Sequence, residues 1–477
     1  MMFIVTAMLR VKPLYANGLT QIWYIKAEAN GDGKTSSNPI GSSALLEQVS
    51  KEGDTIFLLS SDVALKGGLR LKKGQKLIGL SESGQKPIIT NSDATLNGGC
   101  GVVLASENYI VNLRIENTYA SGVYAPKASG IRIDKVEVRR ANLSKSFTNT
   151  KYPVLPGSLP HGGMIFVHSD ASAKVLVTSS IVNHSAGFGI ASIVSDYENS
   201  QLTVSDTRVE GGTRIGFFDA GITALVRGPH ASIRLNVNKS EVQGRLSRSG
   251  RNIMVVASGG AKANASIEQF ISGPTGQDGI VAAVMQSPSE IDIFISDSII
   301  EGAGQMNIEG TLVNLPPEEL SAANQGKVSI VIENSVIRNA GAVAGFEDVA
   351  ANVWLGPSQF IKDSLPAVGE YYLKITGTRI EGAGRSGLEF GDHELLTKGQ
   401  SEKSEYKVVL SDNTIFNNGK AEIMIYAPQT HINAQRNCWG QPGGLANERV
   451  IILPPVDINQ LDVTFPISCV EVEQKNN

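Results

Sequence analysis

A five-residue stretch occurs twice in this chain, letter for letter: Ile-Glu-Gly-Ala-Gly at residues 300–304 and again at 380–384. Each copy follows a short run rich in β-branched residues and a small polar residue, and looser copies lie on both sides. Such a repeat limits the fold strongly, because each unit packs only against its neighbours and the whole becomes a stack of similar layers.

The unit has a core position two residues after a Ser, Thr or Asn. In chain order these pairs are Ser180 and Val182, Thr207 and Val209, Ser240 and Val242, Ser298 and Ile300, Ser335 and Ile337, Thr378 and Ile380, and Asn413 and Ile415. Ile115 and Val138 fit the same register, and we expect Ile271 to fill the gap between the third and fourth pairs. The spacing varies from 23 residues (Ile115 to Val138) to 44 (Val138 to Val182), which is too irregular for propellers or helical repeats.

Each unit also contains two further short strands, one before the polar residue, as at 328–332, and one after the glycine-rich turn, as at 279–284. Three strands and three turns make one rung of a coil. Stacked rungs would lie about 4.8 Å apart, and the small polar residues would form a ladder beside a turn. We therefore predict an all-β fold, a single-stranded right-handed parallel β-helix of about ten rungs.

Composition agrees with a repeat array. A chain of 477 residues exceeds the size at which one globular core usually stops growing. With 50 glycines and 41% apolar residues, it is too rich in glycine for a helical protein and too apolar for disorder. The formal net charge of −4 provides no basic surface for nucleic acid, so we expect no nucleic-acid partner. No apolar run is long enough for a transmembrane segment.

The ends of the chain suggest four regions. Residues 1–16 are an apolar candidate signal segment, although the basic residues follow the apolar run instead of preceding it. Residues 17–100 form an N-terminal capping region and the first rungs, where Ser42 or Ser43 begins a short helix that shields the open end of the stack. Residues 101–440 are the parallel β-helix, and residues 441–477 are a C-terminal tail.

The repeat resembles the pectate-lyase-like right-handed parallel β-helix superfamily over residues 100–440. Its exit, Ile-Asn-Ala-Gln-Arg-Asn-Cys-Trp-Gly at 432–440, is similar to the Asn-Trp-Trp-Gly ending of bacterial extracellular β-helix repeat proteins, with Cys438 replacing the first Trp. The resemblance implies a secreted or cell-surface protein. The superfamily includes lyases, hydrolases, epimerases and non-catalytic surface proteins, so the fold does not specify the function.

A candidate substrate-binding column follows from the strand register. In the strand after the glycine-rich turn, the residue that follows the buried Ile, Val or Leu should point outward. This places six residues in one outward column: Met254, Val281, Glu309, Trp354, Glu389 and Met424. Trp354 would lie between Glu309 and Glu389, whose carboxylates would be about 10 Å apart across two rungs.

The separation of these two carboxylates bears on chemistry. Retaining glycosidases need about 5–5.5 Å and inverting ones about 6.5–9.5 Å between their carboxyl groups. The separation of the pair is therefore marginal for hydrolysis. A flat indole flanked by two carboxylates is better suited to stacking against a sugar ring than to hydrolysis. The alternative is that Trp354 is simply covered by the loop that follows it, at 356–370.

Candidate catalytic residues occur where the repeat is broken. Asp392 and His393 belong to Gly-Asp-His-Glu at 391–394, which is reminiscent of the Asp-Pro-His motif of alginate epimerases but lacks the proline. The alternative is a solvated polar loop. His161 lies in the longest early insertion, 142–163, and such insertions often build the wall of a binding groove.

Arginines make a third group of candidates. Arg245, Arg248 and Arg251 follow one turn, and arginines recognise the carboxylates of acidic polysaccharides through bidentate contacts. We expect Arg245 and Arg248 to bind substrate. The resemblance implies that Arg251 can act as the base of a lyase. The alternative is that all three are solvated turn residues.

Histidines and cysteines show no metal-ligand spacing. Calcium is the one candidate cofactor, through Asp32 in an Asn-Gly-Asp-Gly turn, although the spaced oxygen ligands of a calcium loop are missing. Cys438 and Cys469 could pair in an oxidising compartment. Cys100 is expected to be a buried thiol.

Two functions fit these observations. The first is a secreted or cell-surface protein that binds an extended, anionic polysaccharide or cell-surface glycan on its outer face. The second is a polysaccharide lyase, C5-epimerase or glycoside hydrolase that acts on such a glycan. Because no specific catalytic signature is present, the sequence leaves both open.

Overall fold

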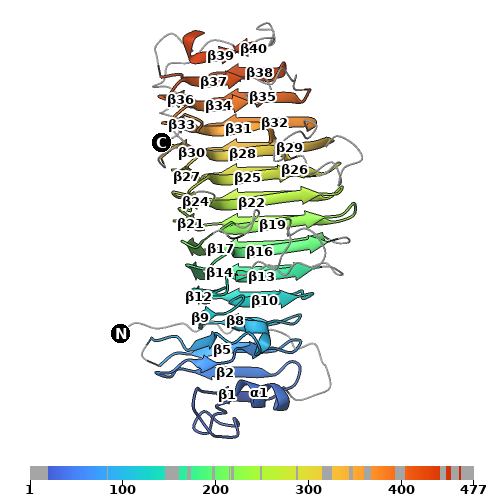
Figure 1. Cartoon of the computed structure of the whole chain (residues 1–477), viewed down its shortest axis with the longest axis vertical. Coiled ribbons are helices and arrows are strands. Elements are labelled where there is room, and N and C mark those ends of the chain that lie inside the picture. Colours follow the sequence, from blue (N-terminus) through green and yellow to red (C-terminus); the bar gives the residue numbers. More distant parts are fainter. Residues whose placement is uncertain are drawn as a thin grey trace, which may run out of the picture.

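The computed structural model describes residues 20–463, apart from the following gaps: 83, 146–160, 169–172, 196–198, 214, 216–219, 248–249, 286–287, 314–324, 343–347, 359–366, 393–402, 441–446 and 453–460. Three long parallel sheets run along the molecule, and their strands stack in columns from the N-terminal to the C-terminal end (Figure 1).

Each sheet is a column in which every strand is hydrogen-bonded to the strands before and after it in the following orders. The 15-stranded sheet contains β1 (Ile22–Ile25), β2 (Thr55–Leu59), β5 (Lys76–Leu80), β8 (Tyr109–Val111), β11 (Ile131–Asp134), β14 (Lys174–Thr178), β17 (Asn199–Ser205), β20 (Ser232–Asn238), β23 (Lys262–Glu268), β26 (Glu290–Ser296), β29 (Gln325–Glu333), β32 (Val368–Thr376), β35 (Glu405–Ser411), β38 (Gln429–Gln435) and β40 (Leu461–Val463). The 13-stranded sheet contains β39 (Val450–Ile452), β37 (Ala421–Ile425), β34 (Ser386–Phe390), β31 (Ala351–Ser358), β28 (Met306–Val313), β25 (Asp278–Val284), β22 (Arg251–Ser258), β19 (Ile222–Arg227), β16 (Phe188–Ser195), β13 (Gly162–His168), β10 (Val123–Pro126), β7 (Val102–Val103) and β4 (Leu69–Arg70). The 12-stranded sheet contains β3 (Leu65–Lys66), β6 (Ile88–Asn91), β9 (Arg114–Thr118), β12 (Glu137–Arg139), β15 (Ile181–Asn183), β18 (Arg208–Glu210), β21 (Glu241–Gln243), β24 (Ile271–Ser272), β27 (Ile299–Glu301), β30 (Val336–Arg338), β33 (Arg379–Glu381) and β36 (Thr414–Phe416).

In each turn the chain passes from the 15-stranded to the 12-stranded and then to the 13-stranded sheet, so the predicted right-handed parallel β-helix is confirmed. The strands from β9 to β36 in the 12-stranded sheet correspond to the ten units of the repeat, and β3 and β6 precede them within the N-terminal region. Beyond residue 440, β39 and β40 extend the other two sheets, so the described part of the tail still adds to the coil.

A polar ladder runs beside one turn of the coil, as the small polar residues predict. The backbone N–H of Ser298 donates to Oγ of Ser335 at 3.2 Å, and the N–H of Ser335 donates to Oγ1 of Thr378 at 3.3 Å. The residue before each rung of the ladder has a positive φ, for example 49° at Asp297 and 61° at Gly377. This left-handed residue turns the chain sharply, and the following hydroxyl satisfies a backbone group that the turn would leave buried.

The prediction for one degenerate unit is wrong. Val242 pairs in register with Ser272, not Ile271, and Ile271 is 41% exposed. Ser272 fills the core position, where its hydroxyl accepts a hydrogen bond of 3.0 Å from Nδ2 of Asn252. A partnered hydroxyl can be buried at little cost, so this rung tolerates a polar residue in an apolar column.

The N-terminal end is capped by the expected short helix, α1 (Ser43–Val49). Ser42 is its N-cap and accepts a hydrogen bond from the backbone of Leu45, while Leu46 is buried in the core. Two single-turn 3₁₀ helices, η1 (Asn97–Gly99) and η3 (Asn447–Arg449), are also described.

The structure also bears on the cysteines. Cys438 is disulfide-bonded, and Cys100 is free and buried. Burial raises the pKa of the Cys100 thiol to about 11, as expected for an inert core thiol. Cys469 lies outside the described residues.

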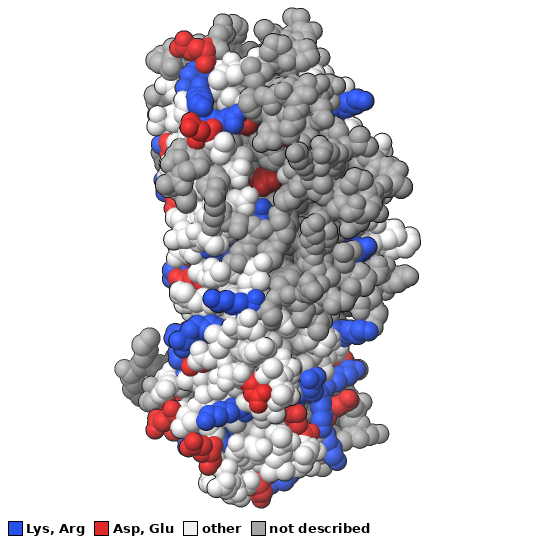
Figure 2. Space-filling model, viewed as in Figure 1, with Lys and Arg blue, Asp and Glu red and all other residues white. Residues whose placement is uncertain are grey.

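The outward side of the 13-stranded sheet differs from a usual solvent face. Its side chains form a second apolar cluster, separate from the core inside the coil, of Ile165, Phe188, Ala191, Ile193, Ala220, Leu225, Met254, Val256, Val281, Ala283, Met285 and Val313. All are buried, and they form a cluster distinct from the core inside the coil. Elsewhere, the described surface mixes Lys and Arg with Asp and Glu and shows no large patch of one sign on the visible face (Figure 2).

Candidate active site: a buried arginine and two carboxyl groups beside a pocket

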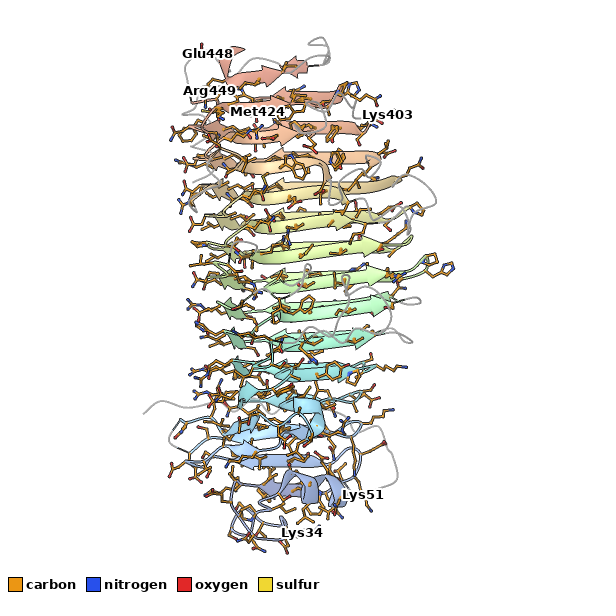
Figure 3. The ribbon with its side chains drawn as sticks, viewed as in Figure 1. Lys34, Lys51, Lys403, Met424, Glu448 and Arg449 are labelled. Atoms are coloured by element: carbon orange, nitrogen blue, oxygen red, sulfur yellow. The ribbon has the colours of Figure 1, made fainter. Side chains whose placement is uncertain are left out.

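The predicted outward column exists. The register pairs Met254 with Val281, Val281 with Glu309, Glu309 with Trp354, and Trp354 with Glu389. Met424 follows Glu389 and lies towards the C-terminal end of the stack (Figure 3). Because each strand alternates inward and outward residues, a buried Ile, Val or Leu before each member fixes its outward direction.

A second outward column lies beside the first, at the beginning of the same strands. Arg251 and Asp278 stand two residues before the buried Ile253 and Ile280, and they pair directly across one rung. Nε of Arg251 lies 2.9 Å from Oδ2 of Asp278. The two side chains are 4% and 0% exposed, so this ion pair is removed from water.

Glu309 completes the cluster from the next rung. Its carboxyl group is in hydrogen-bond contact with that of Asp278. Part of the Glu309 side chain reaches the pocket. Burial of the Glu309 carboxyl group raises its pKa well above the usual range, and the Asp278 carboxylate raises this pKa further. Burial also raises the pKa of Asp278, which the adjacent Arg251 opposes. Contact between the two carboxyl groups disfavours the ionisation of both together, and the hydrogen bond from Arg251 favours the charged form of Asp278.

A pocket of about 140 Å³ opens at this cluster. Its described lining consists of Arg251, Met254, Gln277, Val281, Ala283, Gln305, Met306, Glu309, Thr311, Val313, Trp354 and Ser358. Nε2 of Gln277 donates to Oε1 of Gln305 at 3.3 Å, so two amides stand at one side of the pocket. An ionic group, several neutral polar groups and an aromatic ring thus converge on one cavity, as at many small-molecule sites.

Trp354 lines this pocket as a half-buried side chain, and its Nε1 donates to the backbone oxygen of Gly391 at 3.1 Å. The indole is therefore held in one orientation. One rung further, Glu389 is 4% exposed and accepts a hydrogen bond of 2.8 Å from Oγ of Ser386. Nε of Arg385 lies 3.6 Å from the same carboxyl group.

Glu389 therefore differs from the surface carboxylate expected at this position. Burial raises the pKa of Glu389, and Arg385 lowers it in part. Neither combination of carboxyl groups has the spacing of a glycosidase. Asp278 and Glu309 touch, whereas Glu309 and Glu389 are separated by two rungs, about 10 Å.

Of the two arginine candidates that lie within the described residues, Arg251 adjoins the column and Arg245 does not. Arg245 is 1% exposed, and its Nη2 donates to the carbonyl oxygen of Gly187 at 2.7 Å. Its Nη1 reaches the carbonyl oxygen of Gly211 at 3.3 Å. Arg245 thus joins two earlier turns of the coil, in contrast to the substrate-facing location that we expected. Arg248 lies outside the described residues.

The remaining candidates are distant from the cluster or outside the described chain. His161 precedes β13, three rungs before Arg251, and its Nδ1 is buried without a hydrogen-bond partner among the described residues. Burial lowers the pKa of His161, which favours the neutral imidazole. Asp392 follows β34, two rungs beyond Glu309, where its charge raises the pKa of Glu389. His393 is outside the described residues.

Asp278 was missed because Gln-Asp-Gly at 277–279 resembles a turn. The signal that could have found it is its offset: Asp278 stands two residues before a buried Ile, as does Arg251 one rung earlier. Strand alternation alone would place a residue at this offset inside the coil, so only the alignment with Arg251 marks Asp278 as a candidate.

Within the described residues, no three His, Cys, Asp or Glu side chains come together as a metal site. In the part of the chain that the structure covers, no helix is long and apolar enough to cross a membrane.

Comparisons with known proteins identify no family: no family model and no curated protein sequence matches this chain. Among solved structures, the A-module of the Azotobacter vinelandii mannuronan C-5 epimerase AlgE6 is similar, with 14% identity and a TM-score of 0.46 over 82% of this chain and 91% of that one. A variant of the periplasmic alginate epimerase AlgG has 10% identity and a TM-score of 0.42, covering 84% of this chain and 77% of that one. A rhamnogalacturonan lyase has 10% identity and a TM-score of 0.30, covering 94% and 87%.

The class of this protein is therefore defined by its own geometry. It is a parallel β-helix, and its distinguishing feature is the Arg251–Asp278–Glu309 cluster at a pocket on the outer side of the 13-stranded sheet.

Proposed function

We propose that this protein is a secreted or cell-surface β-helix protein that binds an extended, acidic polysaccharide along the outer face of the 13-stranded sheet. The observation that carries the proposal is that Arg251, Glu309 and Trp354 line one pocket. In this proposal, one carboxylate-bearing sugar occupies that pocket, and the rest of the glycan lies along the column of Glu309, Trp354 and Glu389.

The cluster carries no net negative charge that would repel an anion. The positive charge of Arg251 is balanced by Asp278, and a protonated Glu309 adds no negative charge. Asp278 also fixes the guanidinium, so little side-chain freedom is lost when a ligand binds. A neutral Glu309 and the amides of Gln277 and Gln305 supply donors, while the indole of Trp354 supplies an apolar face for a sugar ring.

A second candidate is an enzyme that moves a proton on the same acidic sugar, as a polysaccharide lyase or C5-epimerase would. It is favoured by the carboxyl pair of Asp278 and Glu309, because burial raises the pKa of both groups and a buried acid with a raised pKa is suited to general acid catalysis. A glycoside hydrolase is less consistent with the spacing of the carboxyl groups, as described above.

Secretion is part of the proposal and has one support in the structure. Cys438 is disulfide-bonded, and disulfides persist mainly in secreted, periplasmic and cell-surface proteins.

The test is a calorimetric titration of the protein with polygalacturonate, alginate and an uncharged polysaccharide. We expect an acidic polymer to bind and the affinity to fall with added salt. Glu309→Ala, which removes the donor at this position, and Trp354→Ala should each weaken binding by about tenfold or more. Arg338→Ala is the matched control, because Arg338 also pairs with a carboxylate but lies on the 12-stranded sheet.

Equal affinity of the wild type and both pocket variants for every acidic polymer would overturn the binding proposal. The enzyme candidate is tested on the same samples by the ultraviolet absorbance of unsaturated products and by the proton NMR spectrum of the polymer. Binding without any change in either readout would leave a binding protein and rule out lyase and epimerase action on those polymers.

A further inference from the structure

A polar groove lies on another face of the coil, on the outer side of the 15-stranded sheet near its C-terminal end. Two adjoining pockets of about 170 Å³ and 530 Å³ share Lys327, Glu370 and Glu405, which lie on β29, β32 and β35. Lys327 pairs in register with Glu370, and Glu370 with Glu405, so the three side chains form one column across neighbouring rungs.

The shape of the groove follows from strand length. β29 and β32 have nine residues each, whereas the flanking β26 and β35 have seven. The additional residues at the start of β29 and β32, Gln325–Gly326 and Val368–Gly369, line the larger pocket. Lys403, which precedes β35, also lines it and lies at the right-hand edge of this end of the coil in Figure 3.

An aromatic ring stands in the smaller pocket. Tyr372 is half-buried and lies in register between Ser329 and Lys407, all three on the lining of that pocket. Beneath it, Tyr371 is buried and stacks on Tyr406 with ring centroids 4.6 Å apart. The stacked pair inside the coil gives this part of the sheet a rigid base, so the groove is preformed.

The charges of the groove balance. Two lysines, Lys327 and Lys407, face two glutamates, Glu370 and Glu405, within the smaller pocket. Nζ of Lys407 lies 3.0 Å from Oε1 of Glu405, and the hydrogen bond between them raises the pKa of Lys407. Such a surface offers both donors and acceptors but has no net charge with which to attract a polyanion.

We propose that this groove is a second carbohydrate-binding site and that it takes an uncharged oligosaccharide. Sugar hydroxyl groups both donate and accept hydrogen bonds, so ammonium groups and carboxylates can hold them in the same site. The ring of Tyr372 packs against the C–H face of a sugar. The groove lies on a different sheet from the Arg251 pocket, so this proposal does not depend on the function proposed above.

The experiment is ligand-observed saturation-transfer NMR with the full chain and three neutral probes: cellohexaose, mannohexaose and xylohexaose. The wild type should bind at least one probe, with little change when salt is added, because the ligand carries no charge. Tyr372→Ala should weaken that binding by about tenfold or more, and Glu370→Gln should weaken it to a smaller extent. Tyr109→Ala is the matched control, since Tyr109 is a half-buried tyrosine on the same sheet but far from the groove.

Absence of binding to all three probes would overturn the proposal, as would equal binding by wild type and Tyr372→Ala. Equal losses in Tyr372→Ala and Tyr109→Ala would also count against it. Trp354→Ala separates the two sites: it should leave neutral-sugar binding unchanged, while the Tyr372→Ala variant should still bind an acidic polymer if the Arg251 pocket does so.

Discussion

Pairs of arginine and carboxylate occur on two sheets of this coil in different surroundings. On the 12-stranded sheet, Arg338 lies 2.6 Å from Glu301, and their side chains are 41% and 30% exposed. On the 13-stranded sheet, Arg251 lies 2.9 Å from Asp278, but the exposed fractions are 4% and 0%. The distances are similar, so the difference between the pairs is the amount of water around them.

The amount of surrounding water determines how much each ion pair contributes to stability. An exposed pair gains little, because solvent screens the attraction and both side chains lose freedom. A buried pair requires the desolvation of two charges, and each partner then depends on the other. The pair of Arg338 and Glu301 is therefore a replaceable surface pair, whereas the pair of Arg251 and Asp278 is a costly buried one at a pocket. Such clusters are a feature of functional sites more often than of scaffolds.

The largest expected effect is the removal of both carboxylates from the buried cluster. The double variant Asp278→Asn, Glu309→Gln leaves the Arg251 guanidinium buried without a counter-charge. We expect the free energy of unfolding in urea at pH 7 to fall by about 3–5 kcal/mol. Asp278→Asn alone should cost less, because Glu309 can then ionise and replace the lost charge.

The control for this experiment is Glu301→Gln, which removes the partner of Arg338 on the 12-stranded sheet. It should change the same free energy by less than about 1 kcal/mol. Equal losses in the buried and exposed variants would show that the two environments do not differ as described.

The second prediction concerns pH. The pKa of Glu309 is raised in the folded protein above its ordinary value of 4.5, mainly by burial and by Asp278. A group with a raised pKa gives its full stabilisation below the unfolded-state pKa and loses it as the pH rises towards the folded-state pKa. The stability of the wild type should therefore fall above about pH 4.5, by up to about 1.4 kcal/mol per pH unit for one proton.

The measurement is a series of urea unfolding curves from pH 4 to 9, for the wild type and Glu309→Gln. The variant carries no titrating group at this position, so its curve should be flatter, with the remaining slope in part due to Asp278, whose pKa is also raised. Identical pH profiles would contradict the raised pKa of Glu309. Binding of an acidic polymer should weaken over the same range, since an ionised Glu309 repels it.

Much of the fold could be predicted from sequence because stacking imposes the same residue type at the same point of each rung. The ladder from Ser298 through Ser335 to Thr378 and the column from Glu309 through Trp354 to Glu389 both follow from strand alternation. Where a unit departs from the pattern, that logic fails. Ile271 was predicted at the core position in place of Ser272. The burial of Ser272 depends on a hydrogen bond from Asn252, and no local pattern shows that contact.

The candidate site was predicted only in part. Glu309, Trp354 and Arg251 were chosen, but their roles depend on Asp278, which a local turn signal concealed. Arg245 shows the opposite error: its sequence surroundings suggest a surface turn, yet its guanidinium donates to carbonyl groups of turns 34 and 58 residues earlier. Contacts between rungs are close in space and distant in sequence, so burial cannot be judged from the neighbours along the chain.

A smaller effect is expected from the polar ladder. Oγ of Ser335 donates to the carbonyl of Glu333 at 2.8 Å and accepts from the backbone N–H of Ser298 at 3.2 Å. Ser335→Ala leaves that N–H buried without its acceptor, and we expect a loss of about 1–3 kcal/mol in the free energy of unfolding. Ser335→Thr keeps the hydroxyl group and should retain most of the wild-type stability. An alanine variant as stable as the wild type would show that the ladder is not a stabilising feature.

The smallest effect is expected at the repeat itself. Ile300 of the first Ile-Glu-Gly-Ala-Gly copy is buried, Gly302 has a φ of 70°, and Glu301 points outward to Arg338. Arg338→Ala removes an exposed ion pair and should change the free energy of unfolding by less than about 0.5 kcal/mol. It should also leave the binding of acidic polymers unchanged. A loss of binding in this variant would move the glycan site to the 12-stranded sheet, so the mildest substitution is also a sharp test of which face of the coil carries the function.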